Sequence, residues 1–293
     1  MSDILQTLSD ALADAVQQAG RSIVRVEARR RMPASGFVWS ADGLMVTAHH
    51  VVEHEENIRI GLPDGSQTKA ALVGRDPNTD LAVLRAESGG LTVPVWAEAD
   101  AVRVGHLALA VGRPSGQLQA TLGVISALSH SPNETHFFAQ TDVVMYPGFS
   151  GGALVSASGQ IIGLNTSALM RGASLTVQTP TLRFVVESLL RHGRMRRGYL
   201  GVGVQPARLP KALAEQIGQK SGVLVMSVEP ESPAERGGLF MGDTILAVDG
   251  QTIENGEDLV SSLGGGRIGQ SVAVRILRGG QVQELQITIG ERG

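Results

Sequence analysis

Short apolar runs separated by turn residues dominate the chain from about residue 20 to about residue 180. The runs include SIVRVEAR, GLMVTA, LAVLRA, HLALAVG and GVISAL, and turns such as Pro63-Asp64-Gly65 and Ser158-Gly159 divide them. Regular short strands with this spacing favour an all-β barrel or sandwich. The pool of 37 glycines fits many tight turns between such strands.

Two helical patterns flank this strand-rich region. Apolar residues recur at helical spacing from Ile4 to Ala19, which predicts an amphipathic helix over residues 1–20. Its apolar stripe is suited either to packing on its own domain or to contact with another copy of the chain. The stretch from Thr181 to His192 predicts a second helix with one apolar face.

A short basic stretch at residues 191–198 is poor in apolar residues and predicts an interdomain linker. It separates a larger domain, residues 21–190, from a smaller one, residues 199–290. The smaller domain contains the strand-like runs YLGVGV, GVLVMSV, DTILAVDG, SVAVRIL and VQELQITI. Short helical patterns near Ser232–Gly237 and Gly256–Leu263 complete the prediction of a small β-rich domain with two helices.

Composition narrows the classes of function. The chain has 25 basic and 28 acidic residues, a balance that argues against nucleic-acid or anionic-membrane partners. Cysteine is absent, which excludes disulfides, a cysteine nucleophile and thiolate metal sites. The first twenty residues contain no export signal or membrane span, so the chain as written is expected in the cytoplasm. The periplasm is the alternative if an export signal has been removed.

The strongest local signal for chemistry is the segment Pro147-Gly148-Phe149-Ser150-Gly151-Gly152. Flanking glycines allow a serine oxygen to be exposed while neighbouring peptide N–H groups point toward one place. Two such donors can bind the oxyanion formed during acyl transfer. Taken alone, the segment fits a glycine-rich turn with an ordinary serine equally well.

The order of candidate partners favours one type of serine hydrolase. An α/β-hydrolase places its acid and histidine after the serine, but only His192 follows Ser150. Candidates that precede Ser150 are His49 and His50, between which spacing does not choose, and Asp80 at the start of an apolar strand. Asp76 precedes a proline and is better explained as a turn residue. The order histidine, aspartate, serine is that of chymotrypsin-like barrels.

Together these segments resemble the HtrA/Deg family of serine proteases. The family pattern T-x-x-H-V-V is met by Thr47–Val52 and implies His50 as the base. The pattern D-x-x-x-D-L-A-V-L is met by Asp76–Leu84 and implies Asp80 as the acid. The pattern G-N-S-G-G-P-L becomes Gly148–Leu154 and implies Ser150 as the nucleophile.

The resemblance implies a mostly β protein, with a chymotrypsin-like double β-barrel protease domain followed by a PDZ domain. It implies a serine endopeptidase of protein quality control that needs no cofactor or metal and whose oxyanion hole is formed by Gly148 and Ser150. Unfolded or extended polypeptides would bind as a strand beside Asn165, Thr166 and Ser167. The family also suggests a homotrimer.

The segment Tyr199-Leu200-Gly201-Val202 resembles the carboxylate-binding loop of HtrA-type PDZ domains. Backbone N–H groups of that loop would bind the C-terminal carboxylate of a peptide, and the following strand would pair with the peptide. The helix near Asp258–Leu263 would form the second wall of the groove. In this family the PDZ domain recruits or senses the tails of substrates.

Departures from the family pattern support a rival interpretation. Phe149 replaces the usual Asn and Ala153 the usual Pro, and Phe149 is expected to narrow the site or hold an inactive loop. The rival is a catalytically inactive scaffold that binds peptide C-termini.

A zinc protease is another alternative, because the motif H-x-x-E-H is matched by His50-Val51-Val52-Glu53-His54. That motif needs a long helix, and the strand-like Asn57–Ile60 follows too closely for one to form.

Overall fold

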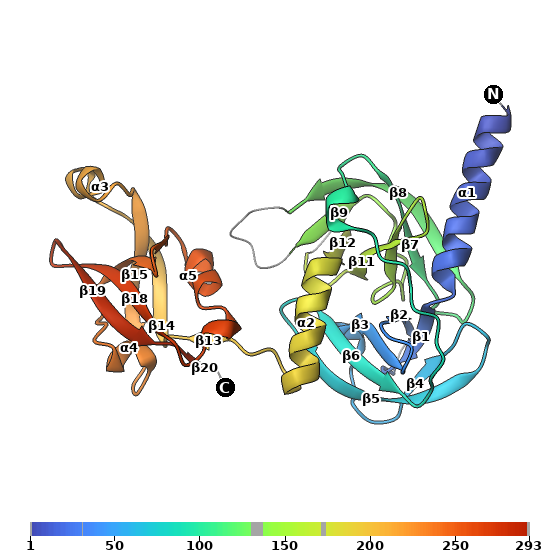
Figure 1. Ribbon diagram of the computed structural model, residues 1–293, viewed down its shortest axis with the longest axis horizontal. Helices are drawn as coiled ribbons and strands as arrows, with labels where there is room; N and C mark the ends of the chain where they lie inside the picture. The colour runs from blue at the N-terminus through green and yellow to red at the C-terminus, as the bar shows by residue number, and fades with distance from the viewer. Residues whose placement is uncertain (1, 31, 130–136, 171–173, 292–293) are drawn as a thin grey trace. The chain divides into compact units, whose positions relative to one another are not determined.

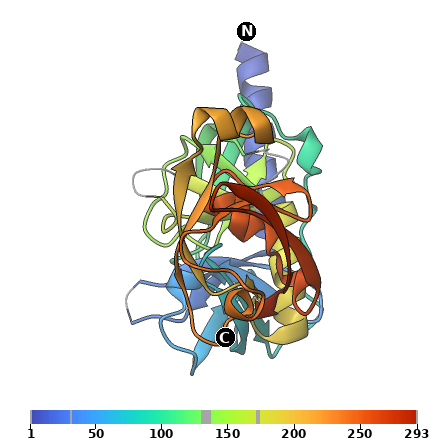
Figure 2. The ribbon, with the colours of Figure 1, turned by 90° about the vertical axis from the view of Figure 1, so that its left-hand side faces the viewer.

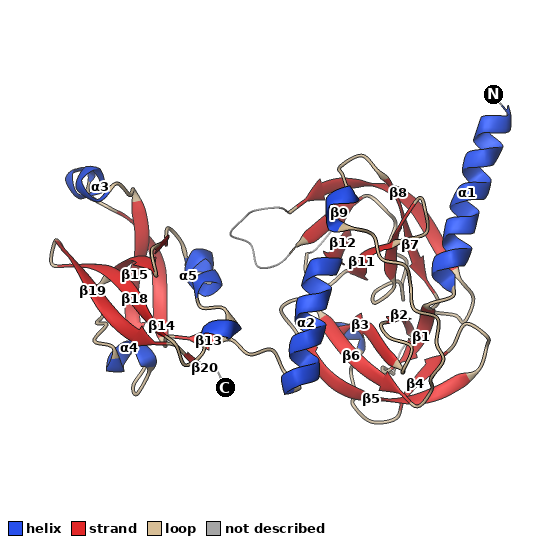
Figure 3. Ribbon diagram, viewed as in Figure 1, coloured by secondary structure: helices blue, strands red, loops and turns tan. Residues whose placement is uncertain are grey.

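The computed structural model describes residues 2–30, 32–129, 137–170 and 174–291. The chain forms two compact units that divide between Met195 and Arg196. Strands dominate both units (Figure 3), which confirms the mostly β fold class. No helix in the described part of the chain is long and apolar enough to cross a membrane.

The first unit contains two closed six-stranded antiparallel barrels (Figure 1). The strands of the first barrel pair in the order β1-β2-β3-β6-β5-β4. Their bounds are β1 Ile23–Glu27, β2 Ala34–Val38, β3 Leu44–Ala48, β4 Ile58–Gly61, β5 Gln67–Asp76 and β6 Leu81–Ala86. Strands β2 and β3 are buried along their whole length, because their inner faces fill the barrel and their outer faces are covered.

The second barrel has the strand order β10-β11-β12-β9-β8-β7. Its strands are β7 Leu107–Gly112, β8 Gln119–Leu128, β9 Phe138–Thr141, β10 Ala153–Ser156, β11 Ile161–Thr166 and β12 Ser174–Gln178. Two short 3-10 helices, η1 (His49–Val51) and η2 (Ala99–Ala101), lie in loops between strands of the first unit. A closed barrel leaves no unpaired edge, so the ends of the strands and their loops carry the exposed chemistry.

Two helices complete the first unit. Helix α2 (Thr179–His192) buries Leu182, Val185, Val186 and Leu189, as its sequence pattern predicts, and Gly193 ends it in the left-handed conformation. Helix α1 (Ser2–Gly20) packs only through its C-terminal half. Its N-terminal half, with Ile4 and Leu5 exposed, extends beyond the barrels in both views (Figures 1 and 2).

The second unit is an open five-stranded sheet in the order β14-β15-β16-β18-β19, with β17 added on β16. A separate pair is formed by β13 and β20. The bounds are β13 Gly198–Tyr199, β14 Val202–Arg208, β15 Ser221–Val228, β16 Thr244–Val248, β17 Gln251–Thr252, β18 Ser271–Arg278, β19 Gln281–Thr288 and β20 Gly290–Glu291. Strand β14 is the first in this order, so one of its edges has no strand partner among the described residues.

Helices α4 (Pro233–Arg236) and α5 (Gly256–Ser262) occupy the two predicted helical segments of this unit, and the 3-10 helix η3 (Gly265–Arg267) follows α5. Asn255 caps α5 through a reciprocal capping box with Asp258. A further helix, α3 (Lys211–Ile217), was not predicted. Its seven residues bury no side chain, so the sequence lacks the apolar stripe by which helices are usually found.

Candidate active site

His50 and Asp80 form a hydrogen-bonded pair within the first barrel. His50 lies in η1, directly after β3, and Asp80 lies directly before β6. These strands are neighbours with Ala48 opposite Leu81, so strand pairing brings the two polar residues together. His50 Nδ1 lies 2.7 Å from Asp80 Oδ2, and the His50 backbone N–H donates to Asp80 Oδ1 over 2.9 Å.

The carboxylate of Asp80 is enclosed, with only 2% of the residue exposed. Burial raises its pKa, but hydrogen bonds from His50 and from the Thr166 hydroxyl outweigh burial and hold the pKa below the ordinary aspartate value. The ionised carboxylate therefore keeps the proton of the His50 ring on Nδ1 and leaves Nε2 as the basic nitrogen. Asp80 adopts a left-handed φ of 54°, a conformation found at strained functional positions.

His49, the neighbouring candidate, has a different environment. Its backbone N–H donates to the Asp80 carbonyl over 2.9 Å, while its ring Nδ1 is buried and has no hydrogen-bond partner among the described residues. Burial lowers the pKa of His49, and the positive charge of Arg75 lowers it further. Of the two histidines, only His50 is hydrogen-bonded to a carboxylate of the described residues, which orients its ring.

Ser150 lies in the loop before β10 of the second barrel. The preceding residues form a β-turn in which the Phe149 N–H donates to the Tyr146 carbonyl over 3.0 Å, with Pro147 and Gly148 at its centre. Gly148 has a φ of 92°, which a type II turn requires at its third position. The Pro-Gly pair thus directs the chain sharply into residues 148–152, the predicted nucleophile loop.

Backbone N–H groups of this loop divide into two sets. Those of Phe149, Gly151 and Gly152 donate to carbonyls of Tyr146, Asn165 and Phe149, respectively. Those of Gly148 and Ser150 have no acceptor among the described residues. Two N–H donors on either side of Phe149 are therefore available to a ligand oxygen.

Close packing makes glycine necessary at two positions in the loop. A Cβ on Gly148 would lie 2.4 Å from Pro114 Cβ, and one on Gly151 would lie 2.1 Å from the Ser35 carbonyl oxygen. Both residues also have positive φ. The G-x-S-G pattern is thus needed for backbone conformation and for the close approach of the two barrels.

Phe149 does not narrow the site. Its side chain is 0% exposed and packs in the core of the second barrel with Ala110, Ile125 and Leu154. Its ring also makes an edge contact with Tyr146, with centroids 5.9 Å apart. The expectation that Phe149 narrows the site is wrong, because its ring lies in the core of the second barrel.

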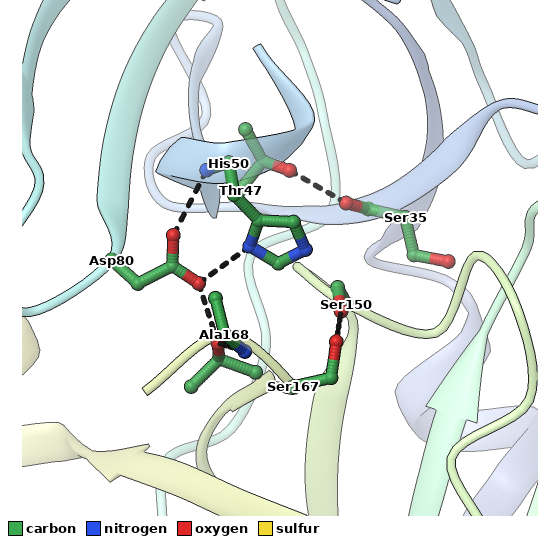
Figure 4. A network of polar contacts seen from close by, with 8 residues as sticks. Ser35, Thr47, His50, Asp80, Ser150, Ser167 and Ala168 are labelled. Carbon is green, nitrogen blue, oxygen red and sulfur yellow. Dashed lines mark hydrogen bonds and ion pairs between the residues drawn. The ribbon is translucent and has the colours of Figure 1, made fainter. Parts of the chain in front are cut away.

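The Ser150 hydroxyl pairs with Ser167 across 3.1 Å. Figure 4 shows the His50 ring with Asp80 at one edge and its other edge toward the side where Ser150 lies. Within the described chain no hydrogen bond joins Ser150 to His50. Catalytic hydrogen bonds are often long without substrate and shorten in the reacting complex.

Residues of the predicted substrate strand have three different environments. Asn165 is 1% exposed, and its backbone N–H and carbonyl pair with Gly152 and Gly151 of the nucleophile loop. Thr166 is buried and donates its hydroxyl to Asp80, a contact that links the two barrels and that no sequence pattern pointed to. Ser167 is exposed beside the Ser150 hydroxyl.

In the second unit, the Tyr199–Val202 segment leads into the edge strand β14. Gly201 has a φ of 82°, and the carbonyls of Leu200 and Gly201 accept bonds from Ala234 and Glu229. Among the described residues, the N–H groups of Leu200 and Gly201 have no acceptor. Helix α5 packs beside β14, and its Leu259 is buried in the core.

The geometry around His54 does not suit the zinc motif. His50 lies in a three-residue 3-10 helix and His54 lies beyond it, so no long helix aligns the two rings. His54 Nδ1 pairs with the Glu56 carbonyl over 2.7 Å. No cluster of three potential ligands occurs in the ranges that the structure describes.

Comparison with known proteins agrees with this architecture. Residues 34–164 match a trypsin-like peptidase domain, and residues 198–289 match a PDZ domain. A probable periplasmic serine endoprotease, DegP-like, from Halomonas elongata is 36% identical over 272 residues, which are 89% of this chain and 57% of that protein. The chain thus spans little more than half the length of this relative.

Solved structures extend the similarity over almost the whole chain. The HtrA-type protease AlgW with a decapeptide has a TM-score of 0.83 and 32% identity, covering 96% of this chain and 99% of that one. The serine endoprotease from Yersinia pestis has a TM-score of 0.81 and 31% identity, with coverage of 96% and 98%. The chain belongs to the HtrA/DegP-like family of trypsin-like serine proteases that carry a PDZ domain.

Proposed function

We propose that this chain is a serine endopeptidase with His50, Asp80 and Ser150 as its catalytic triad. The observation that carries the proposal is the hydrogen-bonded pair of the buried Asp80 with the partly exposed His50, which lies across the barrel junction from Ser150. His50 Nε2 accepts the Ser150 proton as the oxygen attacks a peptide carbonyl, and it then protonates the leaving amine. Water hydrolyses the acyl-enzyme by the same route.

The oxyanion formed in each step is proposed to bind the N–H groups of Gly148 and Ser150. Support comes from their lack of protein acceptors, while the N–H groups around them are paired within the described chain. Each such donor is typically worth about 2.7–4 kcal/mol of barrier.

The substrate is proposed to be an extended polypeptide bound beside Ser167 and Ala168, the exposed residues that directly follow the buried strand β11. Asn165 instead supports the nucleophile loop, because its backbone groups are already paired with it. A peptide must be extended to bind in this way, so folded proteins are cut only where they open locally. This requirement fits a role in protein quality control.

The PDZ unit is proposed to bind peptide C-termini. The edge of β14 is available for strand addition, and the N–H groups of Leu200 and Gly201 are available for a carboxylate. The AlgW structures, solved with a decapeptide and with a tripeptide, support peptide binding in proteins of this architecture. A peptide with a free carboxylate should bind at least tenfold more tightly than its C-terminal amide.

The inactive-scaffold alternative loses one of its two supports, since the buried Phe149 ring does not narrow the site. The test is hydrolysis of a permanently unfolded polypeptide, such as a reduced and carboxymethylated protein, with its folded parent as the comparison. The wild type should cut the unfolded form in the presence of EDTA, and Ser150→Ala should not. A wild type that binds this substrate without cutting it would favour the scaffold.

Compartment and assembly are proposed from relatives. The periplasmic description of the Halomonas protein favours the periplasmic alternative for this chain. The family resemblance favours a homotrimer. Cell fractionation and light scattering test the two proposals, and a cytoplasmic or monomeric protein would contradict them.

A further inference from the structure

Ser35, in β2 of the first barrel, contacts the nucleophile loop of the second barrel directly. It is 0% exposed. Its backbone N–H donates to the Ser150 carbonyl over 3.2 Å, and its hydroxyl donates to the Gly148 carbonyl over 2.8 Å. The hydroxyl also accepts the Arg113 N–H over 2.8 Å. The Ser35 carbonyl accepts the Thr47 hydroxyl over 2.7 Å, as Figure 4 shows.

These contacts restrain two peptide planes of the nucleophile loop. In the peptide plane between Gly148 and Phe149, the carbonyl accepts the Ser35 hydroxyl and the N–H donates to the Tyr146 carbonyl. In the plane between Ser150 and Gly151, the carbonyl accepts the Ser35 backbone N–H and the N–H donates to a carbonyl of β11. The plane between them carries the free Ser150 N–H, so Ser35 holds both neighbours of an oxyanion donor in place.

Glycines surround Ser35 closely. A Cβ on Gly112 would lie 2.8 Å from the Ser35 hydroxyl, one on Gly152 would lie 3.2 Å from Ser35 Cβ, and one on Gly151 would lie 2.1 Å from the Ser35 carbonyl oxygen. Three glycines thus enclose one serine.

The loop that donates to Ser35 is itself fixed. The Arg113 guanidinium donates to the carbonyls of Gly20, Ile23 and Gly116. The backbone N–H of Arg113 therefore donates to Ser35 from a segment that is hydrogen-bonded to the end of α1 and the start of β1. The Ser35 hydroxyl acts as acceptor for this segment and as donor for Gly148, a double role that alanine cannot perform.

We propose that Ser35 is a positioning residue for the oxyanion hole. Loss of its hydroxyl should therefore lower the rate of acyl transfer more than it lowers the affinity for substrate. The inference rests on the proposed peptidase function. Without the hydroxyl, the Gly148 carbonyl loses its only hydrogen bond within the described chain, and the Arg113 N–H is left unpaired. The peptide plane between Gly148 and Phe149, which joins the two donor residues, is then held only by the Phe149 N–H, whereas the Ser35 backbone N–H still binds the Ser150 carbonyl.

The test compares Ser35→Ala with Ser22→Ala. Ser22 is also buried, and its hydroxyl donates to the Ala19 carbonyl at the end of α1, away from the nucleophile loop. With one peptide substrate, Ser35→Ala should lower kcat about 10- to 100-fold while KM changes less than about twofold. The affinity for a peptide boronate, whose adduct requires the oxyanion hole, should fall in parallel with kcat.

Ser22→Ala should lose a comparable amount of thermal stability and keep its kcat within about twofold. Ser35→Cys retains a weak donor and acceptor and should recover part of kcat. If Ser35→Ala does not fold, the same kinetic comparison is made with Ser35→Cys. An unchanged kcat and boronate affinity in Ser35→Ala would overturn the inference, as would equal kinetic losses in Ser22→Ala. An inactive wild type would instead end the peptidase proposal, and this inference with it.

Discussion

The hydroxyl of Ser150 is hydrogen-bonded to Ser167, 3.1 Å away, and not to His50 in the described structure. In the proposed mechanism the Ser150 hydrogen must point to His50 Nε2, so a bond in which Ser150 donates to Ser167 has to break first. A neutral hydrogen bond contributes about 1 kcal/mol net. We infer that Ser167 stabilises the resting enzyme relative to the reacting one by about this amount.

Replacing Ser167 with alanine is expected to raise kcat/KM by up to about fivefold, the factor that corresponds to about 1 kcal/mol. Hydrolysis of a short peptide measures the effect. Ser158→Ala, which alters an exposed serine pair with Ser156, is the matched control and should leave kcat/KM unchanged. A tenfold loss in Ser167→Ala would mean that Ser167 supports the nucleophile.

Replacing Thr166 with valine removes a hydroxyl that donates to the buried Asp80 carboxylate. The folded-state pKa of Asp80 is held below its unfolded value, so the ionised carboxylate contributes stability above about pH 4. That contribution is lost as pH falls through the folded-state pKa. The variant should be about 1.5–3 kcal/mol less stable near neutral pH, and the difference should shrink below about pH 4.

Thr176→Val is the control for this pH dependence. Thr176 is equally buried, but its hydroxyl donates to the neutral Asn165 side chain over 2.8 Å. Urea unfolding at several pH values should give Thr176→Val a stability loss that does not vary with pH. The same constant loss in Thr166→Val would contradict the linkage between Thr166 and the Asp80 pKa.

Gly151→Ala separates the two reasons for glycine in the nucleophile loop. Gly151 and Gly65 have similar φ values, 84° and 88°, but a Cβ on Gly65 meets nothing within 4 Å. Gly65→Ala should cost only the backbone term, about 1–2 kcal/mol. Gly151→Ala should cost more and abolish activity, as urea unfolding and peptide hydrolysis will measure, whereas equal costs would contradict the close contact with Ser35.

Phe149→Ala is expected to lower the free energy of unfolding by about 3–5 kcal/mol, because it leaves a cavity in the second barrel. Phe184→Ala is the control, since Phe184 is 52% exposed and should cost less than about 0.5 kcal/mol. Chemical denaturation measures both. Unchanged stability together with higher activity in Phe149→Ala would show that the ring lies in the substrate site.

Sequence patterns predicted the strand-rich architecture, helix α2 and the fold class. The resemblance to the HtrA/Deg motifs selected the residues that the structure brings together as the Asp80–His50 pair, whereas spacing alone did not choose between His49 and His50. Pairing of β3 with β6 brings the two selected residues together. Asp80 also adopts a left-handed φ, which no pattern of residue types revealed.

Contacts between distant segments were beyond sequence reasoning. Ser35 meets Gly148 across 113 positions, and Thr166 meets Asp80 across 86. Serine and threonine are common in strands and turns, so their roles depend on how the barrels dock. The direction of Phe149 was also missed, because it depends on the turn at Pro147 and not on the residue type.

Labelling with a fluorophosphonate probe tests the central claim most directly, because the probe reacts with a serine only when a base activates it. The wild type should form one covalent adduct, located on Ser150 by peptide mass spectrometry. His50→Ala should reduce the labelling rate at least about 1000-fold, and Ser150→Ala should abolish it. A wild type that is not labelled, or labelling that persists at the same rate in His50→Ala, would contradict the assignment of this triad.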